Sequence, residues 1–370
     1  MKKSMNWIKY LLFLGIGWLL ILIPFFLLIE LFFGSWLVSD LTKKWQDAER
    51  YNVMRNLTIS YDISKIYSGS QTIIKYSRDK NGLRMTCKNP ADIDILTIGG
   101  STTDQRYLRI EDTFQYHLEK KLSAHLGRKV CIANAGLDGH STHGHLASFE
   151  YWLPLIQDLA PKHILLYVGI NDAGFRFEEH KGFDSINEDT FKGYLKANSV
   201  IYSVIRRLKY TFVNSAESAA YAGHNDKSQF IYSETSITNT TPSLAEKNAE
   251  LFYDRLELLL ARINKMKAKH ICITQPHQLS VVTNNKTKGI ASAFEYQSEV
   301  YNGLDYDFAL RKLNNVLSDL CTEKRLIDVY HHPFSNDSFY DLVHTTPKGS
   351  KEISHKIYTD YVNKGFVNEL

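Results

Sequence analysis

A single apolar run near the N-terminus constrains this chain more than any other feature. It covers 24 residues, from Tyr10 to Phe33, with one charged residue, Glu30, and one proline, Pro24. As a helix it would extend about 36 Å, which is more than the ~30 Å hydrocarbon core of a bilayer. A helix buried in a soluble core is rarely apolar on every face over this length. We therefore expect residues 10–33 to form one transmembrane helix.

The alternative is a cleavable signal peptide, which has an apolar core of about 7–15 residues and small residues at its cleavage site. The run is longer, and bulky Phe33 and Trp36 flank the small pair Gly34-Ser35. An uncleaved signal anchor fits better. The lysines before the run, Lys2, Lys3 and Lys9, predict a cytoplasmic N-terminus at residues 1–9. The rest of the chain would then lie on the periplasmic or extracellular side.

The remaining composition is that of an ordinary globular protein. Of the 370 residues, 44% are hydrophobic and 23% are charged, which excludes a disordered chain. Four cysteines are too few for a disulfide-dense scaffold. The net charge of +4 falls to +2 once residues 1–33 are set aside, so the sequence predicts no nucleic-acid partner.

Short apolar strands alternate with amphipathic helices after residue 90. We expect strands at 93–98, 130–133, 163–168, 270–274 and 326–330, and helices at 114–126, 148–159 and 245–267. This alternation predicts an α/β fold, a flavodoxin-like three-layer sandwich with a five-stranded parallel sheet. The expected domain covers residues 91–370. A juxtamembrane stalk and packed extension precede it at 34–90, and a polar insertion with one helix at 199–212 interrupts it at about 172–244.

Small and polar residues follow three of the expected strands, where ligands bind in open parallel sheets. They are Gly99-Gly100-Ser101, Asn134-Ala135-Gly136 and Gly169-Ile170-Asn171-Asp172, and Asp341-Leu342-Val343-His344 opens the expected last helix. Each block alone has a structural interpretation, because Ser and Asp cap helices and Asn and Gly form turns. Together they supply a nucleophile, a base and a carboxylate. Asp341 lies one helical turn before His344, from where it would fix the imidazole.

This set of blocks resembles the SGNH (GDSL-type) hydrolase family, over roughly residues 91–365. The resemblance implies a Ser-His-Asp triad of Ser101, His344 and Asp341. It also implies an oxyanion hole formed by the backbone N–H groups of Ser101 and Gly136 and the side-chain amide of Asn171, with no cofactor and no metal. Gly100 stands where the family's namesake pattern has Asp. Gly-Gly-Ser-Thr variants occur in membrane-anchored branches of the family, so Ser101 remains the expected nucleophile.

Other polar residues receive structural interpretations. Asp172 is expected to hold its loop by hydrogen bonds. The histidines of His140-x-x-His143-x-His145 lack the spacing of common zinc sites and are expected to line the cleft beside Gly136. His331 and His332 are expected to shape the same rim. Among the cysteines, Cys131 and Cys272 are expected to be buried thiols, whereas pairing of Cys87 with Cys321 is left open.

The leading hypothesis is a membrane-anchored serine esterase that acts on O-acyl groups, and membrane-tethered relatives suggest O-acetyl groups of a cell-surface carbohydrate. Three alternatives stay open: an O-acetyltransferase with the same triad, a lipid esterase or thioesterase, and a non-catalytic component of polysaccharide assembly. The polar character of the insertion favours a hydrophilic substrate over a lipid.

Overall fold

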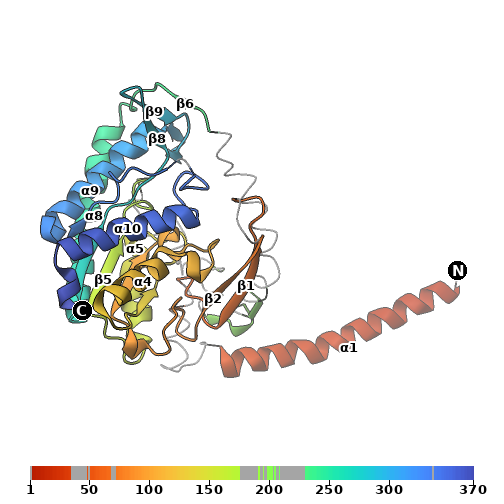
Figure 1. Cartoon of the computed structure of the whole chain (residues 1–370). Helices are drawn as coiled ribbons and strands as arrows, with labels where there is room; N and C mark the ends of the chain where they lie inside the picture. Colours follow the sequence, from red (N-terminus) through yellow and green to blue (C-terminus); the bar gives the residue numbers. More distant parts are fainter. Residues whose placement is uncertain are drawn as a thin grey trace.

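The computed structural model describes residues 2–34, 48, 51–67, 72–175, scattered positions between 191 and 208, 230–335 and 337–370. Residues 35–47 of the stalk and extension expected at 34–90, and most of the insertion expected at about 172–244, lie outside the described residues. Figure 1 shows a domain of helices packed on a sheet, from which one long helix projects.

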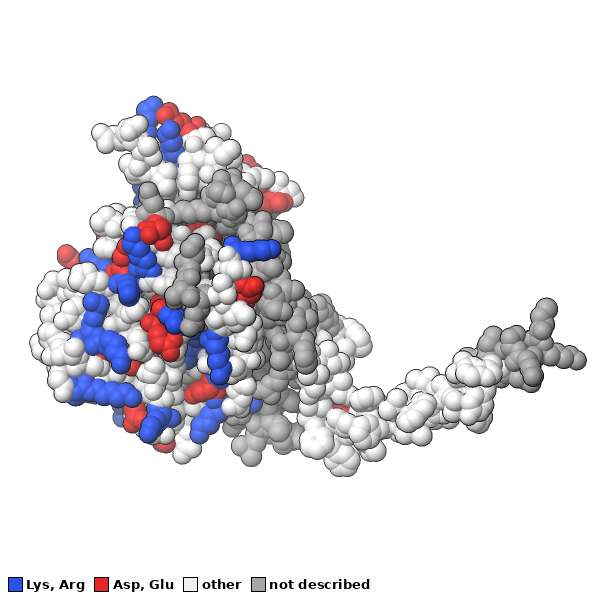
Figure 2. Space-filling model, turned by 45° about the vertical axis from the view of Figure 1, so that its right-hand side comes forward, with Lys and Arg blue, Asp and Glu red and all other residues white. Residues whose placement is uncertain are grey.

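The projecting helix is α1, Lys2–Phe33, which includes Pro24. Its segment Lys9–Phe33 has a mean hydropathy of 2.8 and no buried residue in its most apolar window. Its surface is without visible acidic or basic side chains over most of its length, whereas the domain carries charges of both signs (Figure 2). The chain thus has one N-terminal helix long and apolar enough to cross a membrane.

Five parallel strands form the central sheet, in the order β12-β7-β5-β3-β4. Their bounds are β3 Ile95–Gly99, β4 Ile132–Asn134, β5 His163–Tyr167, β7 Lys269–Ile273 and β12 Leu326–Ile327. Every residue of β3, β4 and β5 is buried, as expected for a parallel sheet covered on both faces. The predicted five-stranded sheet is therefore confirmed.

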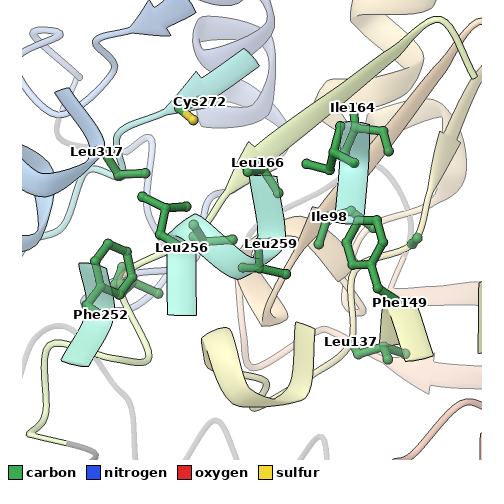
Figure 3. Close-up of a cluster of buried hydrophobic side chains, with 14 of the residues drawn as sticks. Ile98, Leu137, Phe149, Ile164, Leu166, Phe252, Leu256, Leu259, Cys272 and Leu317 are labelled. Atoms are coloured by element: carbon green, nitrogen blue, oxygen red, sulfur yellow. The ribbon is translucent and has the colours of Figure 1, made fainter. Parts of the chain in front are cut away.

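Helices cover both faces of this sheet. Successive strand residues point to opposite sides, so each face presents buried apolar side chains to one layer of helices. Ile95 and Leu165 contact the layer of α4, Phe114–Leu126, and α10, Pro347–Asn363. Leu96 and Leu166 contact the opposite layer, which contains α5, Thr142–Ala147, α8, Thr241–Lys265, and α9, Gly303–Arg325. Figure 3 shows part of that second cluster. The three-layer α/β architecture is confirmed.

Two predicted helices differ from the observed ones. In place of the α-helix expected at 148–159, the chain forms a short π-helix at Ser148–Trp152 and a 3-10 helix at Leu153–Leu155. Pro154 has no N–H with which to continue an α-helix. The last helix begins at Pro347, capped by Thr346, and not at Asp341. Helix α9 was not predicted, although Asn302 and Asp305 at its N-terminus form a capping box.

Smaller antiparallel sheets surround the domain. A hairpin of β1, Leu57–Asp62, and β2, Ile73–Arg78, belongs to the N-terminal extension. A three-stranded sheet joins β6, Tyr232–Ser233, β9, Lys286–Ile290, and β8, Ser280–Thr283. A short pair is formed by β10, Phe294–Tyr296, and β11, Glu299–Tyr301.

All four cysteines form disulfides, which corrects the sequence-based interpretation. Cys87 pairs with Cys131 and Cys272 with Cys321, with Cα–Cα distances of 5.9 and 6.2 Å. Neither Cys131 nor Cys272 is a free buried thiol, and Cys87 does not pair with Cys321. Sequence cannot reveal such pairing, because partners 44 and 49 residues apart meet only in the folded sheet.

We expect the double variant Cys272→Ala/Cys321→Ala to lose about 4 kcal/mol of unfolding free energy, since the bridge closes a long loop between β7 and α9. Urea unfolding followed by circular dichroism measures the loss. The single variants serve as controls, because each removes the same bridge. A loss of less than about 1 kcal/mol in the double variant would contradict this expectation.

Candidate active site

Three predicted site residues meet at the carboxyl edge of the sheet. The imidazole Nε2 of His344 lies 2.7 Å from the Ser101 hydroxyl oxygen. On the other side of the ring, Nδ1 lies 2.7 Å from the Asp341 carboxylate. A continuous chain of two hydrogen bonds therefore joins carboxylate, imidazole and hydroxyl across 240 residues of sequence. This is the geometry that a Ser-His-Asp triad requires.

Two glycines place Ser101 at this edge. Ser101 opens the short helix α3, Ser101–Asp104, directly after β3. A Cβ at Gly99 would collide with the Tyr167 carbonyl, and one at Gly100 would collide with the Asn171 side-chain amide. The absence of a side chain at residue 100 therefore lets Asn171 lie beside Ser101. The departure from the family's Asp has a direct steric reason here.

Asp341 and His344 lie in a loop and not on a helix, contrary to the one-turn argument. Asp341 Oδ1 accepts hydrogen bonds from the backbone N–H groups of Val343, at 2.8 Å, and His344, at 2.6 Å. The other carboxylate oxygen holds the imidazole. The i,i+3 spacing thus brings Asp341 to the imidazole in a turn, and the Asp341 carboxylate itself closes that turn by hydrogen bonds. Asp341 is nearly buried, so its charge acts on His344 with little screening.

The pKa of His344 reflects two opposed effects. Burial disfavours the imidazolium and lowers the pKa, whereas the charge of Asp341 and its hydrogen bond raise it. The balance places the pKa of His344 above its ordinary value of 6.5. Asp341 thus favours the imidazolium that forms when the Ser101 proton is taken up.

Two buried glutamines join the blocks and were not found by sequence analysis. Gln275, just after β7, donates to the Thr102 hydroxyl at 2.8 Å and accepts from the Ile170 N–H at 2.7 Å. Gln105, which ends α3, donates to Thr345 and Ser350 beside His344. They couple the Ser101 turn to the Asn171 loop and the His344 loop. Neither stands in a recognisable motif.

The predicted oxyanion donors are only partly brought together. The side-chain NH₂ group of Asn171 donates one hydrogen to the His140 carbonyl oxygen at 2.8 Å. The same nitrogen lies beside Gly100 and carries a second hydrogen, which is the one that could donate to an oxyanion. The oxyanion role predicted for Gly136 needs correction. The N–H of Gly136 donates to the Asn134 side chain at 2.8 Å, and its Cα packs against the backbone of Thr103 and Asp104. This N–H is engaged within its own loop, so we do not assign it as a donor to the oxyanion.

Gly139 is the glycine of this loop that lies near Asn171. It has a φ of +75°, which favours glycine. The carbonyl of the next residue, His140, accepts from Asn171 and approaches Gly100. A second glycine three residues after Gly136 was visible in the sequence, but which of the two faces the nucleophile depends on the path of the loop.

The other polar predictions have mixed outcomes. Asp172 accepts from the N–H and hydroxyl of Thr142 and from Arg255, so it holds its loop as predicted. His140 and His145 are buried rather than exposed in a cleft, and the His140 ring contacts the Tyr51 carbonyl. Within the described residues, no group of three His, Cys, Asp or Glu side chains could hold a metal. His331 pairs with Asp328 at 2.7 Å.

A stack of three rings contains the triad histidine. Tyr340 lies parallel to His344, with ring centroids 5.7 Å apart and planes 9° apart. Tyr67 stacks on Tyr340 from the N-terminal extension, also at 5.7 Å. No sequence pattern predicts this contact, because Tyr67 and Tyr340 are far apart in the chain and lie in no motif.

Comparisons with known proteins complete this description. No family model matches the sequence, and no curated protein matches it. Solved structures do match. An acetyl xylan esterase shares 13% identity over 72% of this chain and 98% of its own, with a TM-score of 0.38. A lipolytic protein of the G-D-S-L family from Veillonella parvula shares 14% over 73% and 98%, with a TM-score of 0.39. An acetylxylan esterase from Geobacillus stearothermophilus shares 12% over 74% and 94%, with a TM-score of 0.39.

The strand order and the positions of the sequence blocks are observed directly. Ser101 follows β3, the Asn134–Gly139 loop follows β4, Asn171 follows β5, and Asp341 and His344 follow β12. The domain therefore has an α/β fold in which these blocks follow the strands in the order that the resemblance to the SGNH (GDSL-type) hydrolases implies.

Proposed function

We propose that this protein is a membrane-anchored serine esterase whose nucleophile is Ser101. The observation that carries the proposal is the pair of 2.7 Å hydrogen bonds that joins Asp341, His344 and Ser101. A serine hydroxyl is a weak nucleophile unless an adjacent base takes its proton. A purely structural role would not require a buried carboxylate, an imidazole and a hydroxyl in line.

The reaction proceeds by two acyl transfers. His344 Nε2 takes the Ser101 proton while Oγ forms a bond to the ester carbonyl carbon, and His344 then gives that proton to the departing alkoxide. Water, deprotonated by the same imidazole, attacks the acyl-enzyme and releases the acid and Ser101. The developing oxyanion needs fixed donors. We assign the N–H of Ser101, the Asn171 amide and the N–H of Gly139 in place of Gly136, each worth about 3 kcal/mol.

The substrate that we propose is an O-acetyl ester of a carbohydrate. Tyr340 and Tyr67 offer aromatic rings beside His344. A cavity of about 490 Å³ lies beyond β7 and β12, with Tyr330, Ser280 and Thr287 in its lining. The segment after β7 that forms its wall contacts the loop of Asp341 and His344, because the Gln278 N–H donates to the Leu342 carbonyl oxygen at 2.6 Å. The same lining includes the apolar side chains of Ile237, Val281, Val282 and Leu304, so the carbohydrate proposal rests on the two tyrosine rings beside His344.

The two disulfides support a location outside the cytoplasm. Disulfides persist in oxidising compartments and are rare in the cytosol. Both bridges belong to the part of the chain after α1. They therefore support the orientation with residues 1–9 inside and the domain on the periplasmic or extracellular side.

Labelling and acetate release test the function together. Full-length protein in detergent should bind a fluorophosphonate at Ser101 and release acetate from acetylated xylo-oligosaccharides. Ser101→Ala should do neither, and Ser148→Ala, which removes a buried hydroxyl outside the triad, should retain both. Labelling without acetate release, but with transfer to an added sugar acceptor, would identify the acetyltransferase alternative. Absence of both labelling and hydrolysis would refute the enzyme hypothesis.

The pH dependence of kcat/KM follows from His344. Only the neutral imidazole can accept the Ser101 proton, so activity should fall as pH drops through the pKa of His344. Because Asp341 holds that pKa above 6.5, the acidic limb should lie above pH 6.5. A pH–rate profile on p-nitrophenyl acetate measures it. A limb near pH 5 would show that His344 is not the base.

A further inference from the structure

The single charge of the apolar run has partners in the insertion. The Glu30 carboxylate accepts from the Ser199 hydroxyl at 2.5 Å and from the N–H groups of Ile201 and Val200 at 3.0 and 3.3 Å. The Ser199 hydroxyl in turn accepts from the Tyr202 N–H at 2.9 Å, as a helix cap does. Glu30 thus sits at the start of a helical segment, where the helix dipole stabilises a negative charge.

The helical segment presents an apolar face. Val204, Ile205 and Leu208 are 51%, 60% and 51% exposed, and their spacing puts them on one side of a helix. Figure 1 shows this light-green helix near the end of α1. Three large apolar side chains this exposed within one helix are unusual for a surface in water.

We propose that the described helical positions between 199 and 208 lie in the membrane interface, with Val204, Ile205 and Leu208 in contact with lipid. The bilayer is the occupant that the observations favour, because Glu30 ties the start of the segment to the last turn of α1 and so to the membrane surface. The inference requires α1 to span the bilayer but does not depend on esterase activity.

This placement gives Glu30 a role. An ionised carboxylate near the end of a membrane span is costly unless it is paired. The Ser199 hydroxyl and two backbone N–H groups supply that pairing. The domain would then be held at the membrane by a second contact besides the covalent link.

A spin label tests the proposal in the full chain. All four cysteines are paired, so an introduced cysteine can be labelled selectively. Leu208→Cys should, in vesicles of phosphatidylcholine and phosphatidylglycerol, collide several-fold more with oxygen than with a water-soluble nickel chelate. Leu258→Cys on α8, with a similar exposure of 54%, is the matched control and should show the opposite preference.

Two results would overturn the proposal. One is a label at position 208 that behaves like the label at 258. The other is a label that is shielded from both reagents with spin–spin broadening that grows with protein density, which would assign the face to a second copy. Glu30→Leu should lower the oxygen preference at position 208, whereas Glu30→Gln, which keeps an acceptor, should retain most of it.

Discussion

Asp341→Asn is expected to lower kcat by about 10⁴-fold while leaving the fold intact. The amide can still accept from Val343 and His344, but its NH₂ group cannot stabilise the imidazolium, and it can donate to Nδ1 and leave the proton on Nε2. That tautomer cannot take the Ser101 proton. Stopped assays on p-nitrophenyl acetate measure the loss.

The chain supplies a closely matched control. Asp328 and His331 form the same i,i+3 contact at 2.7 Å, but their side chains are 43% and 74% exposed. Asp328→Asn should change kcat by less than about 2-fold, since exposed pairs contribute little. If Asp341→Asn behaved like Asp328→Asn, the triad assignment would be wrong.

Arg78→Met is expected to reduce the unfolding free energy by about 3 kcal/mol. Arg78 donates to the Asp104 carboxylate at 2.7 Å, and both side chains are almost fully buried. Removing Arg78 takes away the cation nearest to the buried Asp104 carboxylate. Arg84 and Arg106 remain at 3.9 and 3.8 Å from Asp104, so the cost should fall at the lower end of the usual 3–5 kcal/mol range.

Chemical denaturation with matched m-values checks this expectation. Arg128→Met removes an exposed guanidinium 3.2 Å from Asp94 and should cost less than about 1 kcal/mol. Because Asp104 lies on the same short helix as Ser101, Arg78→Met should also weaken fluorophosphonate labelling. A stability equal to that of Arg128→Met would contradict the role of the buried pair.

Local patterns predicted the parts of the fold that depend on local physics. The periodicity of residues 114–126 predicted α4 to the residue, and the apolar runs before Ser101 and Asn171 predicted the strands that carry them. The helix at 148–159 failed because Pro154 interrupts an otherwise regular apolar spacing. Asp341 and His344 were found by their spacing, although a turn and not a helix produces the contact.

Long-range contacts could not be read from the chain. The choice between Gly136 and Gly139 depends on how the loop packs against α3, and the cysteine pairing depends on strand order. Tyr67, Gln105 and Gln275 act through partners that no local pattern indicates. These residues join parts of the site that are separated by up to 273 residues, the spacing of Tyr67 and Tyr340.

The N-terminal extension has a consequence for where the chain can be cut. A soluble fragment that begins at residue 91 would lack Cys87 and leave Cys131 as a lone thiol. It would also lack Arg78 and Arg84, the cations beside buried Asp104, and Tyr67, which stacks on Tyr340. A fragment that retains the complete catalytic unit must therefore begin before the β1–β2 hairpin, close to the membrane helix.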